Sequence, residues 1–235
     1  MELNGAVGIV TGASRGIGRA IAEALAARGT KLVLNARTAE ALRDVGEALP
    51  KADVAVVDGD VAEERTAEAL VRVARLRFGR LDLVVNNAGI GHRSTLEKTT
   101  PDVFDRVVAT NLRGPYLLMR AAIPLMRDFG GGTIVNLASL AAVNPVPERA
   151  AYAATKWALL GLSRSVLQEV RKDKIRVIVI EPGSTLTDFG HDPQKLAHAE
   201  KCLKPEDIAA TIVAALALPD RACASEIEIR PTDPP

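Results

Sequence analysis

Tyr152 and Lys156 lie four positions apart in a stretch, Arg149 to Val170, whose composition permits a helix. Residues with this spacing share one face of a helix, so the phenol and the ammonium can act together. A free tyrosine has a pKa of about 10 and is a poor acid or base at neutral pH unless a nearby cation favours the phenolate. The pair predicts a proton donor, Tyr152, and its activator, Lys156, although a half-buried tyrosine followed by a solvated lysine has the same spacing.

Ser139 supplies a hydroxyl that can take part in the same reaction. It ends the predicted strand that begins at Thr133, and the loop to Tyr152 is long enough to bring both hydroxyls to one substrate carbonyl. A role as an acyl-transfer nucleophile is disfavoured, because Ser139 lacks the glycine-flanked elbow and no histidine shows a partnering pattern. We expect Ser139 to hold the substrate oxygen.

A glycine-rich turn follows the first strand-like run and precedes a helical pattern. Its glycines permit a tight turn and let the backbone approach a pyrophosphate at the helix N-terminus. Such turns also occur as simple chain reversals, but the position between strand and helix favours phosphate binding. The turn consists of Thr11, Gly12, Ala13, Ser14, Arg15, Gly16, Ile17 and Gly18.

The end of the second predicted strand lacks the acid that binds the ribose 2′-hydroxyl in many dinucleotide folds. Arg37 lies beside that position, and Arg15 of the glycine-rich turn can converge on the same point. Two guanidinium groups suit a phosphate. We therefore expect NADP(H) to be preferred over NAD(H), against the alternative in which both arginines are solvated surface charges.

An alternation of strands and helices must position these residues. Helical periodicity is clear from Ile17 to Leu25, and Gly29 ends that pattern. Strands that are apolar nearly throughout indicate a parallel sheet covered on both faces, so we predict a doubly wound α/β fold in a single domain, residues 1–235. The seven predicted strands are Val7–Val10, Lys31–Leu34, Val54–Val57, Leu83–Val85, Thr133–Leu137, Arg176–Ile180 and Ile227–Ile229.

The composition excludes several other classes of function. The formal net charge is +1, which gives no overall field that nucleic acid or an anionic membrane would attract. The longest uncharged apolar stretch, Ile208 to Leu218, is too short to span a bilayer and predicts a buried helix. The start of the chain lacks the pattern of a secretory signal, so we expect a cytoplasmic protein with a small-molecule partner.

The spacing of the cysteines and histidines matches no known pattern for a disulfide framework or a metal site. Cys202 and Cys223 have no CxxC spacing, and we expect unpaired thiols. His92, His191 and His198 lack the helical spacing of metal ligands, so we expect no metal.

The loop that holds His92 and Arg93, and the side chain of Trp157, each have a functional and a more ordinary explanation. His92 and Arg93 lie in a loop near the predicted mouth of the site and could meet an anionic substrate, but solvated loop charges are the commoner explanation. For Trp157, packing in a core or a subunit interface is favoured over contact with substrate.

Together these residues resemble the short-chain dehydrogenase/reductase family. The landmarks occur in the family's order along the chain and extend to Thr187. The resemblance implies a Rossmann fold with a seven-stranded parallel sheet, and an enzyme that interconverts a carbonyl and a secondary alcohol. The landmarks are the glycine-rich turn, Asn86-Asn87-Ala88-Gly89, Asn111, Ser139, Tyr152, Lys156 and Pro182-Gly183.

The resemblance also implies a role for each matching residue. Asp60 and Val61 match a pair that contacts adenine, and Asn111 matches a residue that holds a water linking the lysine to solvent. Lys156 is also implied to contact the nicotinamide ribose, together with Tyr152. The cofactor groove is completed by Asn87, Ala88 and Gly89 and, on the nicotinamide side, by Pro182, Gly183 and Thr187.

The implied reaction is hydride transfer between the nicotinamide and the substrate carbon, while Ser139 polarises the oxygen and Tyr152 donates the proton. The resemblance includes 3-oxoacyl-[acyl-carrier-protein] reductases as well as carbonyl and 3-hydroxy acid dehydrogenases, so the substrate stays open between a thioester, a small ketone and a 3-hydroxy acid. A second hypothesis is an NADPH-binding sensor or scaffold without turnover.

We expect a short substrate lid at about residues 184–204. The two long helices around Asn111–Met126 and Tyr152–Val170 suit pairing into a homo-oligomer, either a dimer or a tetramer. The end of the chain departs from many tetrameric relatives, because its last predicted strand is not followed by Gly-Gly. This difference puts the usual tetramer interface in doubt.

Overall fold

Seven parallel strands form one sheet in the computed structural model, which describes residues 1–49, 53–144, 146–189 and 198–233. The strand order is β3-β2-β1-β4-β5-β6-β7. Each predicted strand is found, most of them extended by one or two residues, and the predicted parallel sheet is confirmed. The strands are β1 (Val7–Thr11), β2 (Lys31–Ala36), β3 (Val54–Asp58), β4 (Leu83–Asn86), β5 (Gly132–Leu137), β6 (Ile175–Pro182) and β7 (Glu226–Ile229).

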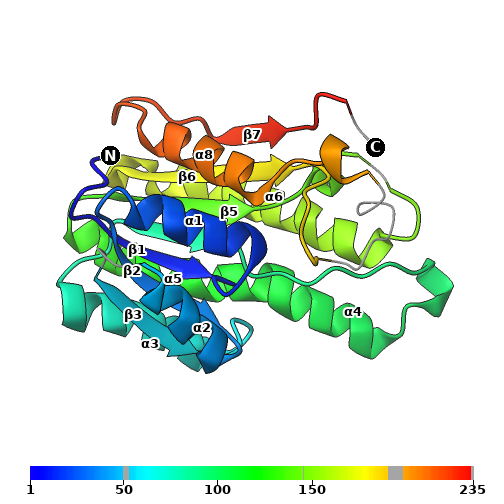
Figure 1. Cartoon of the computed structure of the whole chain (residues 1–235), viewed down its shortest axis with the longest axis horizontal. Coiled ribbons are helices and arrows are strands. Elements are labelled where there is room, and N and C mark those ends of the chain that lie inside the picture. The colour runs from blue at the N-terminus through cyan, green and yellow to red at the C-terminus, as the bar shows by residue number, and fades with distance from the viewer. Residues whose placement is uncertain (50–52, 145, 190–197, 234–235) are drawn as a thin grey trace.

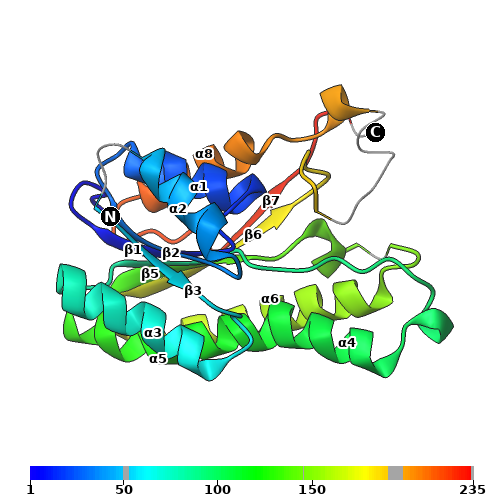
Figure 2. The same cartoon turned by 60° about the horizontal axis from the view of Figure 1, so that its bottom comes forward.

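Helices cover both faces of the sheet, as Figure 2 shows. Above the sheet in that view lie α1 (Gly16–Ala26), α2 (Ala39–Glu47) and α8 (Pro205–Leu216). Below it lie α3 (Glu64–Val73), α4 (Pro101–Val108), α5 (Gly114–Asp128) and α6 (Ala150–Val170). Because both faces are covered, the central strands are buried throughout, which explains their continuous apolar sequence.

Two apolar cores lie on the two faces of the sheet. One includes Leu25 of α1 and Ile212 of α8, and the other includes Met119 of α5 and Val166 of α6. Neighbouring residues along a strand contact different cores, since successive side chains point to opposite faces. The predicted buried helix at Ile208–Leu218 is α8, which begins at Pro205 and ends at Leu216.

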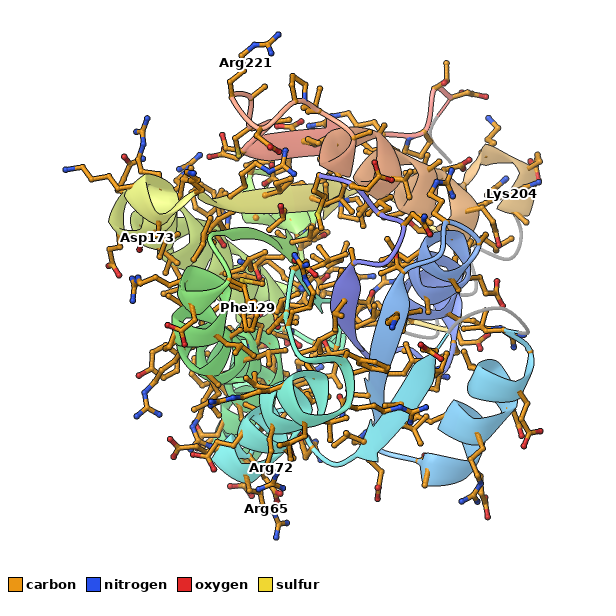
Figure 3. The ribbon with its side chains drawn as sticks, turned by 90° about the vertical axis from the view of Figure 1, so that its left-hand side faces the viewer. Arg65, Arg72, Phe129, Asp173, Lys204 and Arg221 are labelled. Atoms are coloured by element: carbon orange, nitrogen blue, oxygen red, sulfur yellow. The ribbon has the colours of Figure 1, made fainter. Side chains whose placement is uncertain are left out.

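The chain leaves the centre of the sheet in opposite directions after β1 and after β4. The sheet continues from β1 to β2 on one side, and from β4 to β5 on the other. The carboxyl ends of the strands, to which the arrows in Figure 1 point, lie at this switch in strand order, and the residues that follow β1, β4 and β6 there line a cleft. Figure 3 views the opposite end of the molecule, where Arg65, Arg72 and Arg221 point outwards.

A buried chain of polar side chains fixes α6 against the sheet. Asn86 of β4 donates to Asn136 Oδ1 of β5 at 2.8 Å, and Asn136 donates to Ser163 Oγ of α6 at 2.8 Å. All three residues are buried. A bonded buried network specifies one arrangement, because any displacement would leave a polar group without its partner. This network sets the position of the helix that carries Tyr152 and Lys156.

Two local expectations change in the structure. The helix expected around Asn111–Met126 is longer than predicted, because α4, the π turn Ala109–Arg113 and α5 follow one another without a break from Pro101 to Asp128. The side chain of Trp157 is not in the core, since 51% of the residue is exposed. Of the two kinds of packing expected for Trp157, only a subunit interface is compatible with this exposure.

Three further expectations concern the thiols, the lid and the membrane. Cys202 and Cys223 are not in a disulfide. Of the expected lid at 184–204, residues 190–197 lie outside the described residues. No helix in the described ranges is long and apolar enough to cross a bilayer.

Candidate active site

The glycine-rich turn forms the floor of a cleft at the carboxyl end of β1. Gly12 and Gly16 have φ angles of +64° and +55°, a region that glycine adopts without steric cost. A Cβ atom at Gly12 would lie 2.9 Å from the backbone of Ala88, and one at Gly16 would lie 3.3 Å from Thr187. The turn therefore lies close to both the loop after β4 and the loop after β6.

Asn87 joins this turn to the loop after β4. Its side-chain Nδ2 donates to the carbonyl oxygens of Thr11 at 2.9 Å and Gly12 at 3.2 Å. The backbone amides of Asn87 and Ala88 both donate to Thr11 Oγ1. A Cβ atom at Gly18 would overlap the carbonyl oxygen of Gly12, so α1 can begin this close to the turn only without a side chain there.

The residues at the end of β2 include no carboxylate. The Asn35 side chain is occupied, because it donates to the carbonyl oxygens of Val57 and Gly59. Arg37, one residue beyond the strand, is exposed and lines the cleft. Arg15 lines it as well and forms an exposed ion pair with Asp188 at 3.8 Å. Exposed pairs of this kind contribute about 0–1 kcal/mol, so Arg15 can exchange Asp188 for another anion at little cost.

Tyr152 lies in the first turn of α6 and is buried. Burial raises the pKa of its phenol, while a hydrogen bond with Ser139 and the positive charge of Arg149 act in the opposite direction. The expected lowering of the pKa of Tyr152 by Lys156 is not observed. A raised pKa leaves the phenol protonated at neutral pH but makes it a weaker acid, so proton donation needs a neighbouring group that favours the phenolate as the proton leaves.

Lys156 lies one turn further along α6 and is also buried. Its Nζ donates to the carbonyl oxygen of Leu137 at 2.6 Å and lies 5.7 Å from the centre of the Tyr152 ring. Burial lowers the pKa of Lys156 to about 8, because the ammonium loses its hydration. The buried lysine therefore gives up its proton more readily than an exposed lysine does.

Asn111 lies in the π turn Ala109–Arg113 and is fully buried. Its side chain accepts from the amide of Ile90 at 2.8 Å and donates to the carbonyl of the same residue at 2.9 Å. It also donates to Thr155 Oγ1 of α6 at 3.2 Å. A Cβ atom at Gly89 would lie 3.4 Å from Asn111 Oδ1 and 3.8 Å from Lys156 Nζ, so both side chains border the same glycine.

The structure brings most of the predicted site residues to one cleft. Gly18 and Asn111 are not on its wall: Gly18 packs behind the glycine-rich turn, and Asn111 is enclosed by the loop after β4 and α6. The predicted residues that line the cleft are Gly12, Ser14, Arg15, Gly16, Ile17, Arg37, Asp60, Val61, Asn87, Ala88, Gly89, Ser139, Tyr152, Lys156, Pro182, Gly183 and Thr187.

Several other cleft residues have no signal in the sequence. Phe189 packs against Tyr152 with ring centres 5.9 Å apart, and Val146, Leu186 and Ile90 add apolar wall. Arg149 is also on the described wall of the cleft, whereas His92 and Arg93 are not. An apolar or basic residue in a loop has no periodicity to indicate which way it faces, so only the folded arrangement identifies these positions.

Fold and cleft together define a Rossmann-type α/β protein with its ligand site at the switch in strand order. The family model for short chain dehydrogenases matches residues 6–196. The chain therefore belongs to the short-chain dehydrogenase family, as the resemblance implied, and the members reported below are oxidoreductases.

The chain is similar to individual relatives over most or nearly all of its length. An uncharacterized oxidoreductase of Thermotoga maritima is 38% identical over 190 residues, covering 80% of this chain and 75% of that protein. A metagenomic short-chain oxidoreductase solved in complex with NADP is 36% identical, with a TM-score of 0.86 and 99% of each chain covered. A 3-ketoacyl-(acyl-carrier-protein) reductase from Brucella melitensis, solved with NADH, is 31% identical, with a TM-score of 0.91 and coverage of 98% and 99%.

Proposed function

We propose that this protein is an NADP(H)-dependent oxidoreductase that interconverts a carbonyl and a secondary alcohol. The observation that carries the proposal is the position of Ser139, Tyr152 and Lys156 on the wall of a glycine-floored cleft, with the phenol and the ammonium both buried. Burial of a lysine is costly for folding, and titratable groups with shifted pKa values are concentrated at sites where protons move.

The cleft fits a dinucleotide. Side chains at Gly12 or Gly16 would have to adopt a strained backbone and would meet the opposite wall, so the two glycines keep open a cradle of backbone amides before α1. Such a cradle at a helix N-terminus suits a pyrophosphate. Asp60 and Val61 would border the adenine, and Pro182, Gly183 and Thr187 the nicotinamide end. A bound nicotinamide cofactor would supply the hydride.

The chain's own residues would handle the oxygen and its proton. Ser139 orients and polarises the substrate oxygen, and the Tyr152 phenol donates its proton to that oxygen during reduction. The Lys156 ammonium, which has a pKa of about 8 and lies 5.7 Å from the centre of the Tyr152 ring, would supply the replacement proton. Asn111 fixes the wall around Lys156 by binding both Ile90 and Thr155. In oxidation of the alcohol the same groups act in reverse.

The preference for NADP(H) rests on Arg15 and Arg37. Both line the cleft, with Arg37 one residue beyond β2, where an acid would bind a 2′-hydroxyl, and the weak exposed pair with Asp188 would let Arg15 turn to the same phosphate. We expect Arg15→Gln combined with Arg37→Gln to raise the KM for NADPH at least tenfold and to leave the KM for NADH nearly unchanged. An equal change in both KM values would contradict the preference.

The test of the activity is a panel of ketones, diketones and β-ketoacyl thioesters, assayed by the loss of NADPH or NADH absorbance. Turnover of one class with NADPH supports the proposal and identifies the substrate class. The competing hypothesis, an NADPH-binding sensor or scaffold, predicts binding of NADPH with no oxidation by any member of the panel.

The proposal includes the assembly and the setting of the enzyme. Residues 1–235 would work as one domain, with the described residues Ser184–Phe189 forming the near part of a short lid over the cleft. Exposed apolar side chains on α4, α5 and α6 favour a homo-oligomer. The balanced charge favours a small-molecule substrate over nucleic acid or a membrane. The setting would be cytoplasmic, where cysteines such as Cys202 and Cys223 that form no disulfide are usual.

A further inference from the structure

Thr155 lies between Tyr152 and Lys156 on α6, but it is not on the described wall of the cleft. Its side chain is buried, with 1% of the residue exposed. A buried hydroxyl is costly unless it is hydrogen-bonded, so a hydroxyl at this position calls for partners that repay its burial. Those partners indicate what the residue does.

The Thr155 hydroxyl binds two residues of the proposed site. Its Oγ1 donates to the carbonyl oxygen of Tyr152 at 2.7 Å and accepts from Asn111 Nδ2 at 3.2 Å. A hydroxyl has one proton and a carbonyl can only accept, so the proton belongs to the bond with Tyr152. The oxygen of Thr155 then offers only lone pairs to Asn111, and the NH2 group of Asn111 must face it.

The same orientation of the Asn111 amide satisfies the loop after β4. Asn111 Oδ1 accepts from the amide of Ile90 at 2.8 Å, and Nδ2 donates to the carbonyl of Ile90 at 2.9 Å. Ile90 is on the wall of the cleft. One chain of hydrogen bonds therefore runs from the cleft loop through Asn111 and Thr155 to the first turn of α6, and all its bonds agree on one arrangement.

This chain of bonds joins α6 to the loop beside Lys156. A Cβ atom at Gly89 would lie 3.4 Å from Asn111 Oδ1 and 3.8 Å from Lys156 Nζ, so the bonded amide and the ammonium border the same point of the loop. Thr155 precedes Lys156 directly and binds the backbone of Tyr152. A shift of the contact between Thr155 and Asn111 would therefore move both residues relative to the loop.

We propose that Thr155 is a positioning residue, whose hydroxyl holds Tyr152 and Lys156 at the distance from the loop after β4 that proton transfer requires. Thr155 would touch neither substrate nor cofactor, and would act through the carbonyl of Tyr152 and the amide of Asn111. A misplacement of about 1 Å can cost about a hundredfold in rate. This inference rests on the proposed reductase function and adds a residue to its machinery.

Thr155→Val tests the proposal, because it removes the hydroxyl and keeps the branched shape of the side chain. With NADPH and a ketone that the wild type reduces, we expect kcat to fall about ten- to a hundredfold, since the buried NH2 group of Asn111 loses its acceptor and α6 can shift. The KM for NADPH should change little, because the glycine-rich turn is untouched. Thr155→Ser keeps the hydroxyl and should recover most of the wild-type kcat. Thr155→Ala, a second variant without the hydroxyl, should show the same fall, so the test does not depend on the folding of one protein.

Thr133→Val is the matched control. Thr133 is also 1% exposed, and it also accepts one hydrogen bond of 3.2 Å from a buried side chain, in this case from Arg176 Nε. It lies near the amino end of β5 and is not on the described wall of the cleft. The control should lose thermal stability as Thr155→Val does, but keep the wild-type kcat. A wild-type kcat in Thr155→Val, or an equal fall of kcat in both variants, would overturn the positioning role.

The pKa of Lys156 separates this inference from the proposed function, because it is measured without turnover. The NMR signal of Lys156 Cε is identified as the one that Lys156→Met lacks, and is then titrated with base. Burial lowers the pKa of Lys156 to about 8, so Thr155→Val, which lets water approach the ammonium, should raise this pKa towards 10.5, whereas Thr133→Val should not.

The outcomes of the two measurements differ for the two hypotheses. A raised pKa of Lys156 in Thr155→Val, together with a wild type that reduces no ketone, would support the positioning role and contradict the reductase. Turnover by the wild type, with kcat and the pKa of Lys156 unchanged in Thr155→Val, would contradict the positioning role alone. No turnover by the wild type and an unchanged pKa in the variant would contradict both.

Discussion

Lys156 is 4% exposed, and its ammonium donates to the carbonyl oxygen of Leu137. The fall of its pKa from 10.5 to about 8 means that the folded protein holds the proton less tightly than the unfolded chain does. Each pKa unit corresponds to about 1.4 kcal/mol, so burial of the charged form costs about 3 kcal/mol. The proposed function explains why the site keeps a group at this cost, because the proton must be able to move.

Lys156→Met should abolish turnover and change the pH dependence of stability. Below pH 8 the lysine is charged in both states, and the wild type carries the full cost of burial. Between pH 8 and 10.5 the folded form is neutral while the unfolded form is still charged, so wild-type stability rises in this window. The variant lacks this rise. Urea denaturation from pH 7 to 10 measures the difference, and parallel curves for the two proteins would contradict the depressed pKa.

At the scale of elements, sequence patterns predict the strands and the glycine-rich turn better than they predict which residues line the cleft. Continuous apolar runs identify the strands, and the glycine-rich turn identifies the floor of the cleft and the proposed phosphate cradle, because both depend on local chemistry. That Arg149 lines the cleft could not be predicted, since this residue at the end of a loop has no periodicity to indicate which way it faces. The π turn before α5 has no pattern that distinguishes it from an α-helix.

Gly18→Ala should disrupt the start of α1 and weaken NADPH binding at least tenfold. The added Cβ atom would overlap the carbonyl oxygen of Gly12 and the side-chain amide of Asn87, so the turn or the helix must move. The matched control is Gly46→Ala in α2, where the new atom meets Val54 at an ordinary 3.5 Å. Alanine favours a helix by up to about 1 kcal/mol over glycine, so the control should be slightly stabilised. NADPH titration and thermal unfolding of both variants test this, and wild-type affinity in Gly18→Ala would refute it.

For the whole molecule, several large aromatic side chains are exposed on helices of the layer that Figure 2 shows below the sheet. Phe104 of α4, Tyr116 of α5 and Trp157 of α6 are 41%, 47% and 51% exposed. Large aromatic side chains exposed on neighbouring helices are typical of a protein interface. The same layer carries Tyr152, so assembly would fix the helix on which the proposed proton donor lies.

We expect light scattering to give a mass at least twice that of the 24.9 kDa chain. Trp157→Glu should shift the protein towards monomers, because a charge would be buried in the contact without a partner. An exposed substitution on another element, Leu76→Glu, should leave the mass unchanged, since Leu76 lies outside these three helices. A monomeric wild type would contradict the interface.

The most direct measurement is NADPH oxidation by Tyr152→Phe beside the wild type, with a ketone that the wild type accepts. Loss of the phenolic proton should lower kcat by about 10²- to 10⁴-fold, which is the usual contribution of a general acid. The Kd for NADPH should stay within a few-fold, because the aromatic ring and its packing against Phe189 are retained. Turnover within tenfold of the wild type would contradict Tyr152 as the proton donor.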